Sequence, residues 1–136
     1  MAYWLVKSEP DIYSFAQLQK DKSTHWDGVR NFQAAANLKA MKKGEEVLFY
    51  HSNEGKEIVG IAKVLKEAHP DPKDATGKFV MVDLGPVKPL AKPVTLVAIK
   101  AEAKLKDFGL VRQGRLSVMP VSDAQWKLIM KMGGTT

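Results

Sequence analysis

Residues 26–31 bring together, within six positions, the groups that a flat ligand with polar edges would use. Trp26 offers a planar π face, and Arg30 carries a rigid fork of hydrogen-bond donors. Asp27 and Asn31 supply accepting oxygens, and Gly28 lets the backbone bend or approach a ligand closely. A nucleobase is a ligand of this kind. The alternative is a structural loop in which Trp26 caps the core and Arg30 pairs with Asp27.

Three more polar clusters lie at or near the ends of predicted strands: Lys7-Ser8-Glu9, Tyr50-His51-Ser52 and Arg115-Leu116-Ser117. Strand ends converge readily in a small barrel, so these clusters are candidates to share one pocket with residues 26–31. Each cluster also has a structural interpretation. Lys7 and Glu9 would form a solvated ion pair of little energetic value. Tyr50 would be a core residue, His51 a hydrogen-bonded structural histidine, and Arg115 a partner for a helix C-terminus.

The composition is that of one globular domain, which we expect to span residues 1–136. The chain has 136 residues, of which 45% are hydrophobic and 26% charged. Basic residues outnumber acidic ones by 21 to 15, which gives a net charge of +6 and an isoelectric point near 9.5. This surplus favours polyanionic partners through phosphate contacts and counterion release, although solubility alone also explains it.

Cysteine is absent, which excludes disulfides and thiolate metal sites and is natural in a reducing compartment. The first residues lack the features of a signal peptide, and no apolar run approaches the ~20 residues that span a bilayer. We therefore expect a cytoplasmic protein without a membrane partner. His25, His51 and His69 lie far apart in the sequence, without ligand spacing, so the sequence predicts no metal site. No cofactor is expected either.

Hydrophobic periodicity predicts the elements that must position these residues. An aromatic and β-branched run predicts a first strand over residues 2–6. Asp11 is predicted to cap a helix in which Ile12, Phe15 and Leu18 recur at three-residue spacing. The polar residues 19–25 are predicted to form a loop.

A second helix is predicted to begin at its cap Asn31, to run through Met41 and to end at Gly44 in the left-handed conformation. Gly60 and Ala62 leave room for close packing against a strand. The next strand is expected over residues 46–52, in the centre of the sheet. A strand over residues 58–65 is expected to form an antiparallel hairpin with it. After a loop over residues 69–77, a further strand is expected over residues 79–84.

Prolines shape the next segment. Pro86, Pro89 and Pro93 keep it extended and restrict it to a sheet edge, because proline donates no ladder hydrogen bond. Helical turns are expected near residues 96–99 and 105–111, followed by a brief strand over 115–118 with Leu116 and Val118 facing inward.

The last helix is predicted from a capping box of Ser122 and Gln125. Trp126, Ile129 and Met130 form its buried stripe, Gly133 ends it, and the tail is expected to fray. This order of elements, a strand, two helices and then mostly strands with short helices, predicts an α+β domain. We expect a strongly bent sheet or small barrel flanked by helices.

Four segments together resemble a known family: YWLVKSEP, WDGVRN, FYHSNEGKEIVGIAKV and LVRQGRLSVMPVS, at residues 3–10, 26–31, 49–64 and 110–122. In order and spacing they are similar to the EVE domain, a PUA-like family related to YTH readers. The resemblance covers nearly the whole chain. It implies a PUA-like pseudo-barrel of mixed and antiparallel strands, with helices around it. It also implies binding of a modified base, such as methylcytosine or hydroxymethylcytosine, in DNA or RNA.

By position, the resemblance assigns the base pocket to Lys7, Ser8, Trp26, Asp27, Val29, Asn31, Tyr50, His51, Ser52, Arg115 and Ser117. Basic residues expected on the nucleic-acid backbone are Arg30, Lys39 and Arg112. Many members carry a basic residue and an asparagine where this chain has Ala35 and Ala36, which implies that this chain lacks some phosphate or helix-surface contact with a long nucleic acid.

Three functions are compatible with these residues. The first is non-enzymatic recognition of a modified base by a monomer. The second is an enzyme acting on a base or nucleotide with Glu9, Asp27 or His51 as acid or base, although no catalytic triad, phosphate loop or metal motif is recognisable. The third is a protein-interaction module with a small-ligand pocket. The four clusters, the positive charge and the family resemblance favour the first.

Overall fold

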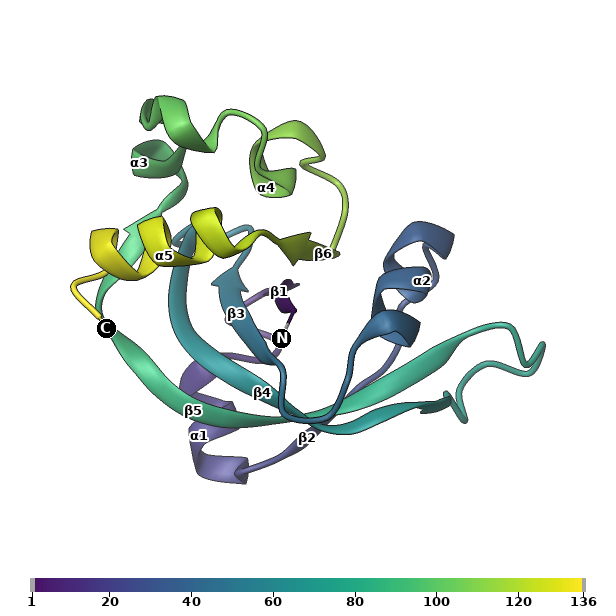
Figure 1. Cartoon of the computed structure of the whole chain (residues 1–136). Helices are drawn as coiled ribbons and strands as arrows, with labels where there is room; N and C mark the ends of the chain where they lie inside the picture. Colours follow the sequence, from purple (N-terminus) through teal and green to yellow (C-terminus); the bar gives the residue numbers. More distant parts are fainter. Residues whose placement is uncertain (1, 136) are drawn as a thin grey trace.

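The computed structural model describes residues 2–135, which fold around one mixed sheet (Figure 1). The strands are β1 (Tyr3–Ser8), β2 (Thr24–Trp26), β3 (Glu46–His51), β4 (Glu57–Pro70), β5 (Val80–Thr95) and β6 (Val118–Val121). The helices are α1 (Phe15–Asp21), α2 (Phe32–Ala40), α3 (Leu96–Ala101), α4 (Gly109–Arg112) and α5 (Asp123–Met132), with a 3₁₀ turn η1 (Ala103–Leu105) after α3. The predicted α+β class is confirmed.

The sheet has the strand order β2-β5-β4-β3-β1-β6. Strands β1 and β3 are parallel, whereas every other neighbouring pair is antiparallel. The long strands β4 and β5 change register at several bulges, and bulges increase local twist and bend a strand. The result is the strongly bent sheet that was expected, but the described strands do not close into a barrel. In Figure 1, α3, α4 and α5 lie together at one end, and α1 lies on the opposite side of β4 and β5.

Strand β5 carries all three prolines that were predicted to need an edge. Among the described residues, β2 pairs with β5 only over Val82–Leu84. The segment of β5 from Pro86 to Pro93 therefore pairs with β4 on one side and does not pair with β2 on the other. The prolines are tolerated there because no strand on that side needs a hydrogen bond from the backbone N–H that proline lacks.

Helix α1 begins later than predicted. Ser14, not Asp11, is the N-cap, and its side chain accepts a hydrogen bond from the Gln17 backbone N–H. Ile12 lies outside the helix and is 76% exposed. Of the three residues predicted at three-residue spacing in this helix, only Phe15 and Leu18 are buried. Phe15 packs on Gly60 of β4, so the close approach expected at that glycine is present.

The segment before the second helix also differs from prediction. Residues 24–26, expected in a loop, form β2 because β5 offers them a partner. Asn31 caps α2 as predicted, its side chain accepting from the Ala34 N–H. The helix ends at Ala40 with the extended Met41 as its C-cap, rather than at Gly44. Gly44 does have a positive φ of 90°, but it serves the turn into β3.

The C-terminal part is close to prediction. Helix α5 has the capping box, the buried stripe and the Gly133 end that the sequence indicated. The strand expected over residues 115–118 begins only at Val118, and β4 extends through Pro70 into the predicted loop. The tail does not fray at Thr135, which is 7% exposed and whose Oγ1 accepts a hydrogen bond from the Ala91 N–H.

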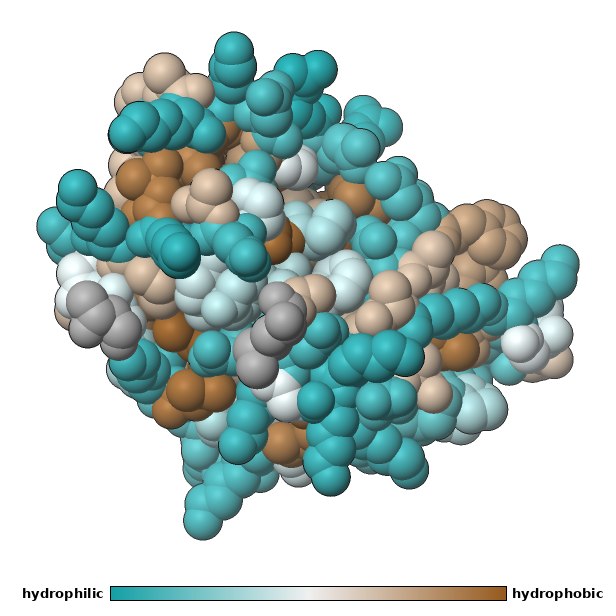
Figure 2. Space-filling model, in the orientation of Figure 1, coloured by the Kyte–Doolittle hydropathy of each residue, from teal (hydrophilic) through white to brown (hydrophobic). Residues whose placement is uncertain are grey.

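The visible surface is mostly polar. Figure 2 shows charged and polar residues over most of one face, with apolar residues between them. Among residues 2–135, the large apolar side chains that are exposed are Ile12, Phe32, Val87 and Val97. Within residues 2–135, none of the helices has the length and apolar character that crossing a membrane requires.

Candidate functional site

Three of the four polar clusters meet at one end of the sheet. Because β1 and β3 are parallel, their last residues lie side by side, with Lys7 opposite Tyr50 and Ser8 opposite His51. Strand β6 runs antiparallel to β1, so the residues before it reach the same end, and the Lys7 N–H donates to the Ser117 carbonyl at 3.0 Å. The expectation that strand ends converge is therefore confirmed for these clusters.

The first cavity at this end, which we call the Tyr50 pocket, has a volume of about 270 Å³. Its lining consists of Lys7, Tyr50, Ser52, Asn53, Lys56, Leu96, Lys100, Leu110, Val111 and Gly114. The Lys7 ammonium lies 6.0 Å from the centre of the Tyr50 ring and donates to the Gly114 carbonyl at 2.7 Å. Burial lowers the pKa of Lys7 and raises the pKa of Tyr50. The pocket thus combines an aromatic ring with three ammonium groups.

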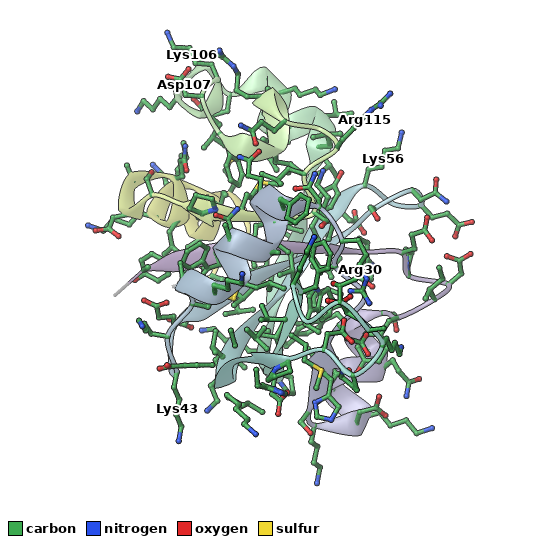
Figure 3. All side chains as sticks on the ribbon, turned by 90° about the vertical axis from the view of Figure 1, so that its right-hand side faces the viewer. Arg30, Lys43, Lys56, Lys106, Asp107 and Arg115 are labelled. Carbon is green, nitrogen blue, oxygen red and sulfur yellow. The ribbon has the colours of Figure 1, made fainter. Side chains whose placement is uncertain are left out.

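A second cavity, the Arg115 pocket, adjoins the first and shares Gly114 with it. It has a volume of about 310 Å³ and is lined by Asn31, Gln33, Gln113, Gly114, Arg115 and Leu116. Asn31 reaches it because capping α2 places this residue at the helix start. In Figure 3, Arg30, Lys56 and Arg115 lie on one side of the molecule, away from Lys43 and Lys106. Lys56 and Arg115, which line the two pockets, therefore lie on the same side of the molecule.

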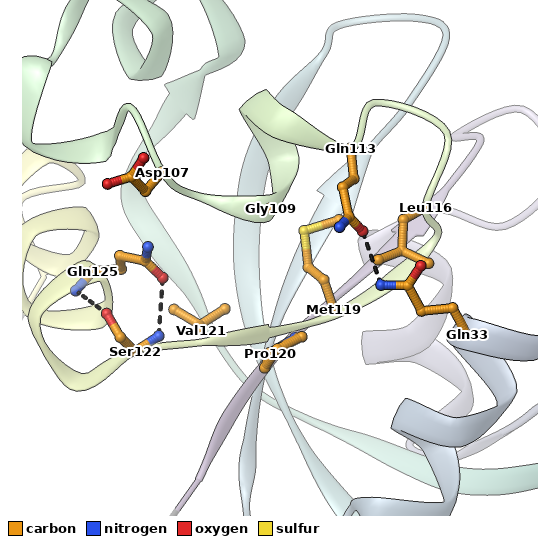
Figure 4. Close-up of a pocket in the computed structure, with 10 residues that line it drawn as sticks. All are labelled: Gln33, Asp107, Gly109, Gln113, Leu116, Met119, Pro120, Val121, Ser122 and Gln125. Atoms are coloured by element: carbon orange, nitrogen blue, oxygen red, sulfur yellow. Dashed lines mark hydrogen bonds between the residues drawn. The ribbon is translucent and has the colours of Figure 1, made fainter.

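A third cavity, the Met119 pocket, continues from the Arg115 pocket (Figure 4). It measures about 410 Å³ and shares Gln33, Gln113 and Leu116 with its neighbour. Gln33 donates to Gln113 at 3.0 Å across the boundary. The floor is apolar, with Met119 and neighbouring β6 residues, whereas amides and Asp107 form the rim. None of the sequence-predicted site residues lines this cavity.

Residues 26–31 are held by a carboxylate that the sequence prediction missed. Asp71, only 2% exposed, accepts hydrogen bonds from the Gly28 N–H and from Arg30 Nη1, both at 2.9 Å, and from the Lys73 N–H at 2.8 Å. Burial opposes ionisation of Asp71, but these donors outweigh it and lower its pKa. The suggested Arg30–Asp27 pair is wrong, because Asp27 pairs with Lys73 at 3.1 Å.

Trp26 lies in β2 and packs against the core rather than lining one of the three pockets. Its ring meets Phe49 edge-on at 5.6 Å and Tyr13 at 6.5 Å between centroids. Val29 is also buried, at 8% exposure. Stacking of a base on Trp26 stays a prediction, and the observed contacts match the structural alternative in which this tryptophan caps the core.

Ser8 and His51 make internal hydrogen bonds. The Ser8 hydroxyl donates to the Tyr13 carbonyl, and His51 Nε2 accepts from the Phe15 N–H at 3.1 Å. Because Nε2 accepts, the neutral ring carries its hydrogen on Nδ1. Burial lowers the pKa of His51, and the facing Glu57 partly opposes this shift. This histidine is therefore held in the neutral state and positions the start of α1.

The residues predicted to contact the nucleic-acid backbone differ in whether their side chains already pair with a carboxylate. Arg30 pairs with Asp71, and its guanidinium lies 5.3 Å from the Phe79 ring centre. Arg112 pairs with Asp107 at 3.2 Å, and both side chains are exposed. Lys39 lies exposed in the last turn of α2. Of the two alanines that depart from the family pattern, Ala35 is buried in the core and Ala36 is exposed.

An open, bent mixed sheet with lysine- and arginine-lined pockets at the shared end of β1 and β3 places this chain in a class of small mixed-sheet α+β domains. Residues 2–132 match the EVE domain, and the chain belongs to this family. The resemblance seen in its four sequence segments is confirmed.

Its relatives include thymocyte nuclear protein 1 of Homo sapiens, which is 32% identical over 165 residues and covers 96% of this chain and 73% of that protein. An NMR structure of Rpa0253 from Rhodopseudomonas palustris is 54% identical, with a TM-score of 0.94 and coverage of 98% of this chain and 94% of that one. A crystal structure of human THYN1 in complex with 5-methylcytosine-containing DNA is 31% identical, with a TM-score of 0.92 and coverage of 100% and 99%.

Proposed function

We propose that this protein binds a modified cytosine, of the 5-methylcytosine type, in DNA, and does so without catalysis. The observation that carries the proposal is the convergence of Lys7, Tyr50, Ser52 and Arg115 on two adjoining pockets at one end of the sheet. The human relative bound to 5-methylcytosine-containing DNA supports the ligand class. The three ammonium groups and the tyrosine that line the Tyr50 pocket suit a ligand that is both aromatic and anionic.

The geometry suits a single base rather than an intact duplex. A base inside a helix is unreachable, so it must leave the stack at a cost of a few kcal/mol. Tyr50 is only 3% exposed, so a base in the pocket would meet the edge of its ring, and the about 1–3 kcal/mol of a fully stacked base is an upper bound for this contact. The Ser52 hydroxyl and the Asn31 side chain provide polar contacts for base edges, and Arg115 and Lys7 attract the neighbouring phosphates. RNA with the same modification is the second ligand that this chemistry accepts.

Catalysis is not part of the proposal because two of the three acid and base candidates have structural duties, and the third, Glu9, lines none of the three pockets. His51 accepts a backbone hydrogen bond through Nε2, and Asp27 pairs with Lys73. Neither residue lines the three pockets.

The test is fluorescence-monitored binding of short oligonucleotides with cytosine, 5-methylcytosine or 5-hydroxymethylcytosine, as single and double strands of DNA and RNA. We expect tighter binding to one modified DNA, by the roughly 1–3 kcal/mol that a single methyl group provides in an apolar pocket. Arg115→Ala and Lys7→Met should weaken binding by about tenfold each, since both remove a charge at the pockets. Lys43→Ala is the matched control, because this exposed lysine lies away from Arg115 (Figure 3). Equal affinity for every oligonucleotide would contradict base recognition.

A further inference from the structure

Two histidines that are far apart in the sequence meet around one aspartate. His25 Nδ1 lies 2.7 Å from Asp83 Oδ1, and His69 Nε2 lies 3.0 Å from the same oxygen. The two imidazole rings stand edge to face, 6.2 Å apart. We call these three residues the His-Asp cluster. Sequence distance therefore did not keep His25 and His69 apart, and the expectation of no metal site stays a prediction.

Strand pairing creates the cluster. In the β2–β5 ladder His25 stands directly opposite Asp83, and His69 comes from β4 on the other side of β5. A strand alternates its side chains between two faces, so His25 points away from the face on which Trp26 contacts the core. The cluster is thus separate from the three pockets, none of which includes its residues.

The donor set is one that transition metals prefer. Two imidazole nitrogens and one carboxylate oxygen, all within 4.8 Å of one another, are three of the four ligands of a tetrahedral site. Bonds of about 2.1 Å to a central ion place neighbouring ligand atoms of a tetrahedral site roughly 3.4 Å apart. To reach this value the two imidazole–carboxylate separations of 2.7 and 3.0 Å must widen slightly, and the two imidazole nitrogens, which lie within 4.8 Å of each other, must adjust by side-chain rotation. The His25 side chain is 65% exposed, which gives an ion access from solvent.

We propose that the His-Asp cluster binds a divalent transition-metal ion of the Zn²⁺ or Ni²⁺ class, with solvent in the remaining coordination positions. Imidazole nitrogen suits these ions, whereas Mg²⁺ and Ca²⁺ prefer sites built from oxygen alone. The ion ties three strands together, and one of them is β2, whose three residues lead directly into residues 26–31. Metal binding therefore stabilises the entry to the segment that Asp71 holds.

The alternative is a hydrogen-bonded triad in which Asp83 accepts from both imidazoles. Zinc titration of the untagged protein by calorimetry and by NMR of the histidine side chains distinguishes the two. We expect one ion per chain and a raised melting temperature, with shifts in the His25 and His69 ring signals and none in those of His51. His51 is an internal reference because its Nε2 already accepts the Phe15 N–H.

His25→Ala and Asp83→Asn should each weaken zinc binding by about tenfold or more, since either change removes one of three ligands. His25 is exposed, so its variant should fold, which circular dichroism verifies. Asp107→Asn is the matched control for the carboxylate, because Asp107 is exposed and lies near no histidine in the cluster. The proposal is overturned if zinc binds the His25→Ala variant as tightly as the parent protein, or if the His51 signals shift instead.

Discussion

Asp71 is the residue on which the conformation of residues 26–31 depends most. Its carboxylate is buried and accepts hydrogen bonds from Gly28, Arg30 and Lys73. Asp71→Ala leaves two backbone N–H groups and part of a guanidinium without this acceptor. We expect the free energy of unfolding to fall by about 2–3 kcal/mol, most of it from the unpaired backbone groups, because the half-exposed Arg30 is screened by water. Urea unfolding measures the change.

The exposed Asp107–Arg112 pair is the control for this prediction. Both of its side chains are well exposed, at 72% and 66%, and such pairs contribute at most about 1 kcal/mol. Asp107→Ala should therefore have little effect on unfolding. Equal destabilisation by the two substitutions would mean that burial of Asp71 has no energetic consequence.

His51 makes stability depend on pH in a mildly acidic range. Burial lowers the pKa of His51 in the folded protein below its ordinary value of 6.5, so the unfolded chain takes up a proton first as the pH falls. The contribution of His51 is complete above about pH 6.5 and declines as the pH falls toward the folded pKa. Thermal unfolding across pH 7 to 5 should show this decline.

His51→Gln tests the assignment, because glutamine keeps an acceptor for the Phe15 N–H but does not titrate. The variant should lose less stability than the parent between pH 7 and 5. Parallel curves for the two proteins would show that His51 is not the group responsible. The carboxylate of Asp71, whose pKa is lowered, affects stability only as the pH falls below about 4.

At the scale of elements, the contact of α1 with the sheet depends on Gly60. A Cβ built on this residue would lie 2.4 Å from Cζ of Phe15 and 2.5 and 2.6 Å from its two Cε atoms, closer than a Cβ can lie to another carbon. Gly60→Ala should lower the free energy of unfolding by about 1–3 kcal/mol, the usual cost of overpacking a core. Phe15→Leu in the same chain should recover part of this loss, because the two sites share one contact.

Gly114→Ala is the control for the glycine, since a Cβ there would have no atom within 4 Å and its φ is not positive. Chemical denaturation should place it within about 0.5 kcal/mol of the parent. If Gly60→Ala were as harmless as Gly114→Ala, the helix would have to shift away from β4 without cost.

The elements that could be predicted from the sequence are those with local causes. The Asn31 cap, the Ser122–Gln125 capping box and the buried stripe of α5 are all defined within a few residues, and all were found. The start of α1 was misplaced because Asp11 and Ser14 are both good caps, and the choice is made by packing of Phe15 on Gly60.

Of the site residues, only those at a predicted strand end or a predicted helix cap could be placed from the sequence. Lys7 and Tyr50 follow from two parallel strands that end together, and Asn31 follows from a helix cap. Asp71 has partners 41 and 43 residues away, and His25 and Asp83 are 58 residues apart, separations that no local pattern reports. The face on which Trp26 lies depends on the register of β2 against β5, and three residues are too few to indicate it.

At the scale of the whole molecule, the net charge of +6 alone would attract any nucleic acid weakly. What distinguishes this chain is where part of the charge lies: Lys56 and Lys100 line the Tyr50 pocket with Lys7, and Arg115 lines the adjoining one. A polyanion held there would release counterions in proportion to the phosphates contacted. The distribution of charge therefore predicts where on the surface a nucleic acid binds, which the total charge does not.

We predict that Lys56→Ala and Lys100→Ala each reduce the slope of log affinity against log salt by about 0.7–0.9, the value for one lost phosphate contact. Lys43→Ala, which removes the same charge from an exposed position away from the pockets, should leave the slope unchanged. Anisotropy titrations of one 5-methylcytosine oligonucleotide at several salt concentrations measure all three. Equal slopes for the three variants would mean that the oligonucleotide responds to total charge, and the nucleic acid would then have to be placed elsewhere on the surface. A reduced slope with an unchanged preference for the modified base would separate the phosphate contacts of Lys56 and Lys100 from the recognition of the base itself.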